Sequence, residues 1–566
     1  MVLLDAFTPD TNPFDRRWLS ALVAALPILT MLVTLGVLRW KAHLAGAVSW
    51  VVAFVVAVTA FGMPASMAVG TSLHGFVYGL FPIVWILLTA IWMYEVTVAS
   101  GRFDDLKRTF FLLSDDPRVL ALLIAFCFGG LLEALAGFGA PVAITAAMLV
   151  AIGFSPLRSA MTALLANTVP VAFGAVGLPV IMAAKAGGFD DVIPIATISG
   201  RMTAILCLIV PFLLLAVMDG MKGVKEVWPF GLVVAASFGV TKWIVSSTPL
   251  YNLTEAVAAV VSVVVAIGFL RFWKPRGGET AVHRVAQPID PALEQHLTVH
   301  TPADVKDSAL TTRRILMALV PYALVIVVFS IAAIPRVKAA LVSTDLEFSW
   351  PLLAGMNNVA GAPASHQTYH FAWASTPGIL LALVAVVVGL IYRMTLPAIF
   401  GVLWTNAKRL RFTALTIGSV VALAYVMGDS GQTLALGLFI ATTGALYPFF
   451  APVLGWIGTY VTGSDTSANI LFSGLQSGVG EQIGGAGAHL SVDEMRMLLV
   501  GGGGVGGVVG KMISPQSLSV ASTAIGIPGA ESAILRRMIP WSLILLVLLC
   551  VLSGLMSTPV LSWLLP

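Results

Sequence analysis

The feature that most constrains the fold is a series of predominantly apolar runs, most of them about as long as a helix that crosses a lipid bilayer. A bilayer core about 30 Å thick needs about 20 apolar residues per helix. Apolar residues make up 58% of the chain and charged residues only 10%, whereas a soluble domain carries about 25% charged residues. The sequence therefore predicts an all-α polytopic membrane protein with about 12–14 transmembrane helices. The clearest runs are Trp18–Leu38, Leu44–Phe61, Gly75–Ser100, Val227–Val245, Leu253–Phe272 and Trp541–Leu555.

Charge and cysteine content exclude several classes of partner. The net charge is +4 over 566 residues, and the sequence has no basic stripe, so we expect no nucleic-acid partner. Cys127, Cys207 and Cys550 lie in apolar runs at separations that fit no metal site, and an odd number argues against a disulfide framework. The sequence thus gives no reason to expect a metal ion or another cofactor. Its first residues lack a basic segment before an apolar core, so we expect no cleaved signal peptide.

One long polar segment, residues 274–314, interrupts the apolar pattern. Its basic residues gather at the two ends, with Lys274 and Arg276 at one end and Arg313 and Arg314 at the other. Because loops rich in Lys and Arg stay on the cytoplasmic side, we expect a cytoplasmic linker. The linker is expected to join a first membrane repeat, residues 1–273, to a second, residues 315–566.

Each of these halves contains a pair of unusual stretches. The first half has "LLEALAGFGAPVAITAAML" (131–149) and "LLANTVPVAFGAVGLPV" (164–180), and the second has "VTGSDTSANILFSGLQ" (461–476) and "GGGGVGGVVGKMISPQSLSVA" (501–521). In each pair, short apolar arms surround a tip rich in Gly or hydroxyl residues, and an apolar run broken by Pro follows. The arms, about 15 and 10 residues long, are too short to span a bilayer and predict re-entrant hairpins.

Unwound backbone at membrane depth is tolerated only where protein or a water-filled cavity surrounds it. We therefore expect the four stretches to meet and to line a cavity. Pro170 and Pro515 should break their helices and leave backbone groups free for a ligand. One hairpin and one broken helix per half is typical of a secondary transporter built from two inverted repeats. Ordinary packing is the alternative, since Gly and Pro are frequent in transmembrane helices.

The motifs in these stretches resemble those of the bacterial L-lactate permease family. The resemblance rests on "AGFGAPVAITAA" (136–147), "ANTVPVAFGAVGLPV" (166–180), "GSDTSAN" (463–469) and "GKMISPQSLSVA" (510–521), and so covers both halves in order. It implies a proton-coupled symporter of the bacterial inner membrane that carries L-lactate, D-lactate and glycolate by alternating access. Two stretches depart from the family pattern, "GGGGVGGVVG" before Lys511 and "YVMGDSG" around Asp429, so exact substrate and coupling stay open.

A small 2-hydroxy carboxylate needs a cation or amide donors, a partner for its hydroxyl and a small apolar wall. Lys511 and Arg201 are the candidate partners of the carboxylate, although Lys511 could instead extend to the membrane interface and Arg201 could be a loop-end residue. Phe138 and Phe173 could form the apolar wall. The candidate hydroxyl and amide contacts are Asn167, Thr168, Ser464, Thr466, Ser467, Ser514 and Gln516.

Coupling to a proton requires a group that can hold a proton at membrane depth, and ionised carboxylates are costly there. The candidates are Glu133 in the first hairpin, Asp465 in the second, and Asp429 at a Gly-flanked break. Asp465 could instead pair permanently with Lys511, and Glu133 could cap a hairpin tip. Glu255 is expected to lie at the membrane interface.

Three other interpretations remain open. A sodium ion could replace the proton, because unwound carbonyls and hydroxyls can bind one. An intramembrane enzyme is disfavoured, because no HExxH motif occurs and Val426 stands where an aspartyl-protease motif would need a glycine. A channel would have less reason to repeat its hairpins. We therefore expect a carrier and not an enzyme.

Overall fold

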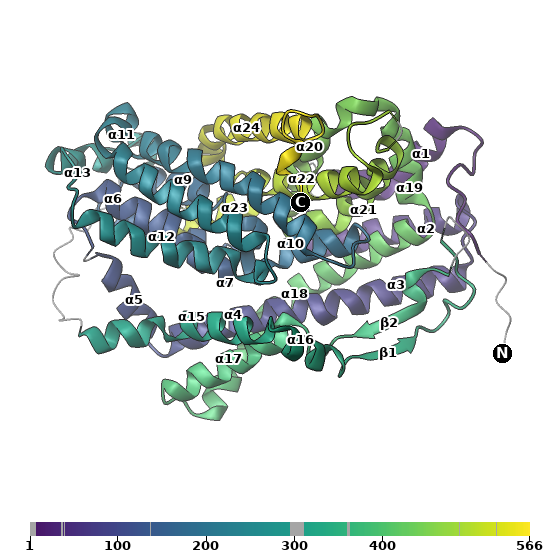
Figure 1. Ribbon diagram of the computed structural model, residues 1–566, viewed down its shortest axis with the longest axis horizontal. Helices are drawn as coiled ribbons and strands as arrows, with labels where there is room; N and C mark the ends of the chain where they lie inside the picture. The colour runs from purple at the N-terminus through teal and green to yellow at the C-terminus, as the bar shows by residue number, and fades with distance from the viewer. Residues whose placement is uncertain are drawn as a thin grey trace.

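The chain folds into long helices that run side by side in the computed structural model (Figure 1). The structure describes residues 7–34, 38, 40–111, 113–135, 137, 139–294, 311–358, 363–485, 487–527 and 529–566. Within these residues, nine helices are long and apolar enough to cross a membrane, or ten if one bent pair is a span. This number is below the predicted 12–14 because four further apolar helices are shorter and because the 54-residue segment Ile193–Ser246, which turns at its middle, counts once. The predicted all-α membrane fold is confirmed.

One set of helices packs around α18 and is called here the α18 group. It takes helices from both halves of the chain, and most of it lies along the lower side of Figure 1. A two-stranded antiparallel hairpin of β1 (Leu346–Ser349) and β2 (Thr368–Phe371) extends from it. Its helices are α1 (Arg17–Leu32), α2 (Ala42–Thr59), α3 (Ala65–Tyr78), α4 (Trp85–Ala99), α5 (Arg102–Phe111), α15 (Thr312–Ala332), α16 (Pro335–Val342), α17 (Pro377–Ile391), α18 (Leu396–Asp429) and α19 (Gln432–Ile440).

The remaining helices pack around α22 and form the α22 group. The long helix α11 contains a turn at Asp219 and Gly220, so it makes two passes. The helices of this group are α6 (Pro117–Ala121), α7 (Gly129–Leu135), α8 (Ala140–Ala151), α9 (Pro156–Ala166), α10 (Gly174–Ala186), α11 (Ile193–Ser246), α12 (Thr254–Leu270), α13 (Gly278–Ala286), α14 (Pro291–Glu294), α20 (Tyr447–Thr462), α21 (Asp465–Ile483), α22 (Val492–Lys511), α23 (Pro515–Ala524) and α24 (Glu531–Met556).

The described part of the linker folds against the α22 group. Arg284 of α13 donates to Asp219 at 2.6 Å, and the fully buried Arg118 donates to the same carboxylate at 3.0 Å. These bonds hold the linker beside the turn of α11, at the end of the molecule opposite the β1–β2 hairpin (Figure 1).

The unusual stretches form the breaks that the sequence predicts. In the first half, α9 and α10 are bent by 60° about the turn at 167–173, and Ala175 and Val176 have left-handed φ values of 44° and 60°. In the second half, the chain between α22 and α23 is not helical, and Ser514 caps α23. The second hairpin differs from expectation, because α21 is 19 residues long. Its polar positions are buried in protein, as for Gln476, which donates to the carbonyl of Ala451 at 3.0 Å.

Candidate functional site

All four unusual stretches meet at one small cavity of about 30 Å³ in the α22 group. The first hairpin, the first broken helix, the second hairpin and the second broken helix each contribute to its wall, so the predicted meeting of these segments is confirmed. The lining residues are Glu133, Gly137, Val171, Gly174, Ala175, Pro179, Gly463, Ser464, Asp465, Thr466 and Lys511.

A buried ion pair crosses the cavity. The Nζ atom of Lys511, at the end of α22, lies 2.7 Å from Oε1 of Glu133 on α7, and their side chains are 10% and 2% exposed. The other oxygen of Glu133, Oε2, has no hydrogen-bond partner among the described residues. From the sequence, Asp465 was the possible partner of Lys511. In the structure, Lys511 pairs with Glu133 instead.

Asp465 lies beside this pair, at the start of α21. Its Oδ1 accepts a hydrogen bond of 3.3 Å from Thr459, and its Oδ2 has no partner within the described part of the chain. Ser464 caps the helix by accepting from the amide of Ser467 at 3.3 Å. The amide-bearing end of α21 therefore faces the cavity, and such an end favours a bound anion.

Glycines make this close assembly possible. A Cβ atom on Gly507 would collide with the carboxylate of Asp465, and one on Gly506 would collide with the backbone of Pro452. A Cβ atom on Gly174 would lie 2.8 Å from Oε1 of Glu133. Small residues let helix backbones approach in membranes, which accounts for the "GGGGVGGVVG" run on α22.

The other candidate binding residues of the second half differ in whether they line the cavity, line a wider cleft or are buried away from both. Thr466 lines the cavity, and Ser464 lies between it and a wider cleft of about 740 Å³ that Ser467 and Gln516 also line. Ser514 is fully buried and donates to the carbonyl of Lys511 at 3.0 Å, so it supports the end of α22.

Several predicted site residues do not reach the cavity. Arg201 donates to the carbonyls of Leu564 and Leu565 at 2.8 and 2.7 Å and so holds the C-terminal segment. Asn167 and Thr168 are buried just after the end of α9, where the hydroxyl of Thr168 donates to the carbonyl of Leu164 at 3.4 Å.

Asp429 and the two phenylalanines also lie elsewhere. Asp429 accepts hydrogen bonds from Thr71 at 3.1 Å and from His366 at 2.8 Å, within the α18 group. Phe173 is buried at the end of the turn at 167–173, and its side chain does not line the cavity. Phe138 lies outside the described residues.

Sequence reasoning missed a second buried ion pair. Lys242 on α11 and Glu255 on α12 lie 2.8 Å apart with no exposed side-chain surface. Glu255 lies in the first turn of α12, near the end of its span as expected, and its side chain is buried against α11 inside the α22 group. A lysine within the apolar run Val227–Val245, three residues before its end, was the available signal, since ionisable residues in membrane-spanning segments mark functional sites by default.

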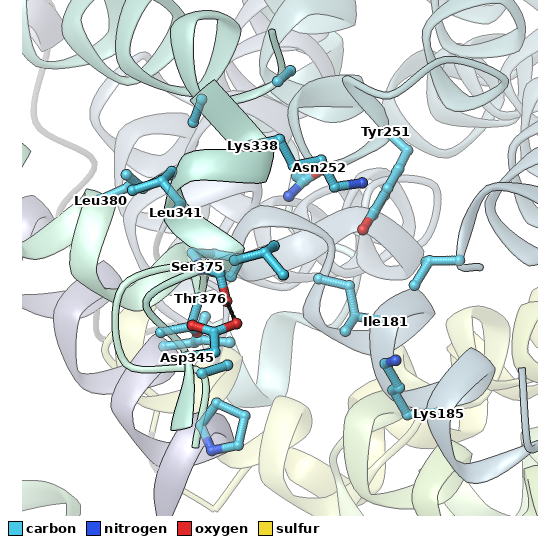
Figure 2. Close-up of a pocket in the computed structure, with 18 of the residues that line it drawn as sticks. Ile181, Lys185, Tyr251, Asn252, Lys338, Leu341, Asp345, Ser375, Thr376 and Leu380 are labelled. Atoms are coloured by element: carbon cyan, nitrogen blue, oxygen red, sulfur yellow. Dashed lines mark hydrogen bonds between the residues drawn. The ribbon is translucent and has the colours of Figure 1, made fainter. Parts of the chain in front are cut away.

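A second wide cleft, of about 760 Å³, separates the α18 and α22 groups on the side of the β1–β2 hairpin. Figure 2 shows Ile181 and Lys185 of α10 on one wall, and Asp345 with Ser375 on the opposite wall. Ser375 donates to Asp345 at 2.6 Å. This cleft shares no lining residue with the small cavity. Among the described residues, no group of three or more His, Cys, Asp or Glu side chains is placed to hold a metal ion.

Comparisons with known proteins agree on one family. The sequence model of the L-lactate permease family matches residues 20–560. The chain is 39% identical over 543 residues to the glycolate permease GlcA of Escherichia coli, covering 94% of each chain. It is 37% identical over 568 residues to the L-lactate permease of Bacillus subtilis, covering 97% of each. It is 35% identical over 570 residues to the L-lactate permease of Salmonella typhimurium, covering 98% of each.

Proposed function

Because the chain belongs to the L-lactate permease family, we propose that it carries L-lactate and related 2-hydroxy monocarboxylates, D-lactate and glycolate, together with a proton. It is a multi-pass protein of the bacterial inner membrane. Its relatives are named as permeases for L-lactate or glycolate, and these acids share one carboxylate and a neighbouring hydroxyl. The observation that carries the proposal is the lysine in a cavity built from both halves of the chain.

Lys511 and the amide-bearing end of α21 supply the positive charge that a carboxylate requires. Thr466 and Ser464 line the same cavity and can bond the 2-hydroxyl group. The apolar wall comes from Val171, Ala175 and Pro179. This combination of a cation, hydroxyl groups and a small apolar wall suits a short hydroxy acid.

The substrate carboxylate and Glu133 compete for Lys511, and this competition couples transport of the anion to uptake of a proton. The substrate carboxylate takes the place of Glu133 beside Lys511, and a proton on Glu133 removes the charge that would otherwise be left unpaired. Asp465, which has an unpartnered oxygen in the same cavity, is the second carboxyl that can hold a proton. Carrying a proton with the anion cancels an electrical cost of about 2.3 kcal/mol per 100 mV.

Alternating access requires the cavity to open in turn to each side of the membrane. A volume of about 30 Å³ equals the share of liquid volume that one water occupies, so the cavity has to widen to admit lactate. The tip at Gly463 and Ser464 lines both the cavity and the 740 Å³ cleft. Moving this tip therefore opens a route on one side, and sliding the α22 group along the α18 group offers a route on the other.

Transport in proteoliposomes tests the function directly. We expect an inward proton gradient to drive accumulation of labelled L-lactate, a protonophore to abolish it, and glycolate and D-lactate to compete. An inward sodium gradient at equal pH on both sides should drive nothing. Accumulation driven by sodium alone would favour the sodium-coupled alternative, and absence of both uptake and exchange for all three acids would contradict the proposal.

A further inference from the structure

The ion pair of Lys242 and Glu255 lies outside the cavity and takes no part in the competition for Lys511. Both side chains are fully buried, and neither residue lines the cavity. Two ionised groups held in the interior of a membrane protein are costly to maintain. Their contacts show what the pair does there.

Lys242 contacts the turn of the first broken helix at two points. Its Nζ atom donates a hydrogen bond of 2.7 Å to the carbonyl of Val169, and it lies 5.3 Å from the centre of the Phe173 ring. The helix α9 ends at Ala166, and the amide of Phe173, which would bond the Val169 carbonyl in a continuous helix, donates to the carbonyl of Pro170 at 3.2 Å instead. Lys242 therefore contacts the turn outside the cavity, whereas Val171 of the same turn lines the cavity.

Glu255 extends the contact to the first hairpin. Its Oε2 pairs with Lys242, and its Oε1 has no partner among the described residues. A Cβ atom on Gly130 would lie 3.7 Å from this Oε1. Gly130 precedes Glu133 by three residues on α7, so the two share a face of that helix. The pair therefore contacts both segments that the first half contributes to the cavity, without lining the cavity itself.

We propose that Lys242 and Glu255 are positioning residues, which fix the turn at 167–173 so that the cavity keeps its shape for a small carboxylate. The proposal rests on the function proposed above. The backbone near this turn is strained, with Ala175 and Val176 at left-handed φ values, and such conformations persist only where their surroundings hold them. Without Lys242, the carbonyl of Val169 loses its hydrogen bond and the Phe173 ring loses its contact with the ammonium group.

The first test replaces the pair while keeping its volume. Exchanging both partners of a buried ion pair for apolar residues is often neutral for stability, whereas removing one leaves an uncompensated charge. We therefore expect the double variant Lys242→Met with Glu255→Met to stay folded, with a melting temperature lowered only by the loss of the hydrogen bond to the carbonyl of Val169. Its KM for L-lactate should rise about tenfold or more through lost preorganisation, with little change in kcat. Lys242→Arg, which keeps the donor and the charge, should restore most of the affinity. An unchanged KM in the folded double variant would make the pair purely structural.

A second measurement needs no substrate. In a background without Cys127, Cys207 and Cys550, a Val171→Cys variant reports the exposure of the turn to a soluble thiol reagent. We expect the double methionine exchange at positions 242 and 255 to speed its modification about tenfold, as local opening becomes less costly. An equal rate with and without the pair would overturn the positioning role. Failure of the wild-type protein to transport any 2-hydroxy acid would contradict the proposed function alone, and this rate would still decide the role of the pair.

Discussion

The Nζ atom of Lys511 lies 2.7 Å from Oε1 of Glu133, so one buried ion pair joins the two halves of the chain at the cavity. A carboxylate substrate that binds this ammonium must displace Glu133. The displaced carboxylate then lacks a counter-charge in a site of low dielectric constant, which is costly unless it takes up a proton. We therefore infer that anion binding and protonation are linked through this lysine.

Replacing Lys511 tests this link at the substrate. We expect Lys511→Met to lower uptake of L-lactate at least about 100-fold, because a buried charged partner of the carboxylate is lost. The matched control is Lys185→Met, which changes a lysine of the wide cleft in Figure 2 that shares no residue with the cavity. The measurement is initial uptake in proteoliposomes, normalised to folded protein by size-exclusion chromatography. Uptake by the Lys511→Met variant at the wild-type rate would remove Lys511 from the site.

Replacing Glu133 tests whether its protonation is linked to binding of the anion. In Glu133→Gln, the side chain is permanently neutral, so Lys511 is always available to the anion. We expect exchange of labelled for unlabelled lactate to continue, while accumulation against a gradient of substrate is lost. Asp429→Asn is the control, since Asp429 bonds His366 and Thr71 away from the cavity. Comparable loss of exchange and accumulation in Glu133→Gln would point to a structural role for the pair.

Local sequence patterns were sufficient to predict which segments meet. Proline, glycine and hydroxyl residues in apolar runs marked four segments, and all four line the cavity, although the second predicted hairpin contains the 19-residue helix α21. The sequence did not show which carboxylate pairs with Lys511, because Asp465 and Glu133 both line that cavity. Only the way the helices cross places Glu133 within reach of the lysine.

Other assignments failed because their partners are distant in the sequence. Arg201 bonds carbonyls 363 and 364 positions away. Lys242 was not identified as a candidate residue from the sequence, because one lysine hardly changes the mean hydropathy of a long apolar run.

The glycines of α22 are expected to be intolerant of even one added methyl group. In Gly507→Ala, the new Cβ would collide with the carboxylate of Asp465 and the hydroxyl of Thr459. We expect a loss of about 1–3 kcal/mol in stability from overpacking, together with loss of uptake. Gly401→Ala on α18 is the matched control, because nothing lies within 4 Å of its Cβ position and alanine favours helix. Thermal unfolding in detergent compares the two, and equal melting temperatures would contradict the close packing at Gly507.

The β1–β2 hairpin segment should be held less firmly at alkaline pH. His366 lies beside Asp429 at 2.8 Å, 28% exposed, and it also faces His74 and stacks on Tyr425. Burial lowers the pKa of His366, but the charge of Asp429 and the hydrogen bond to it raise this pKa above the ordinary 6.5. A raised folded-state pKa means that the stabilisation is complete below about 6.5 and is lost as pH rises through the folded-state value.

We therefore expect limited proteolysis between residues 343 and 376 to accelerate as pH rises above 6.5, after correction for the pH dependence of the protease itself. His366→Gln should remove this pH dependence, because the amide carries no titrating charge. His283→Gln, at an exposed position on α13, should leave it intact. Cleavage of the wild-type protein that is equally fast from pH 5.5 to 8.5 would show that the His366–Asp429 contact does not hold the segment.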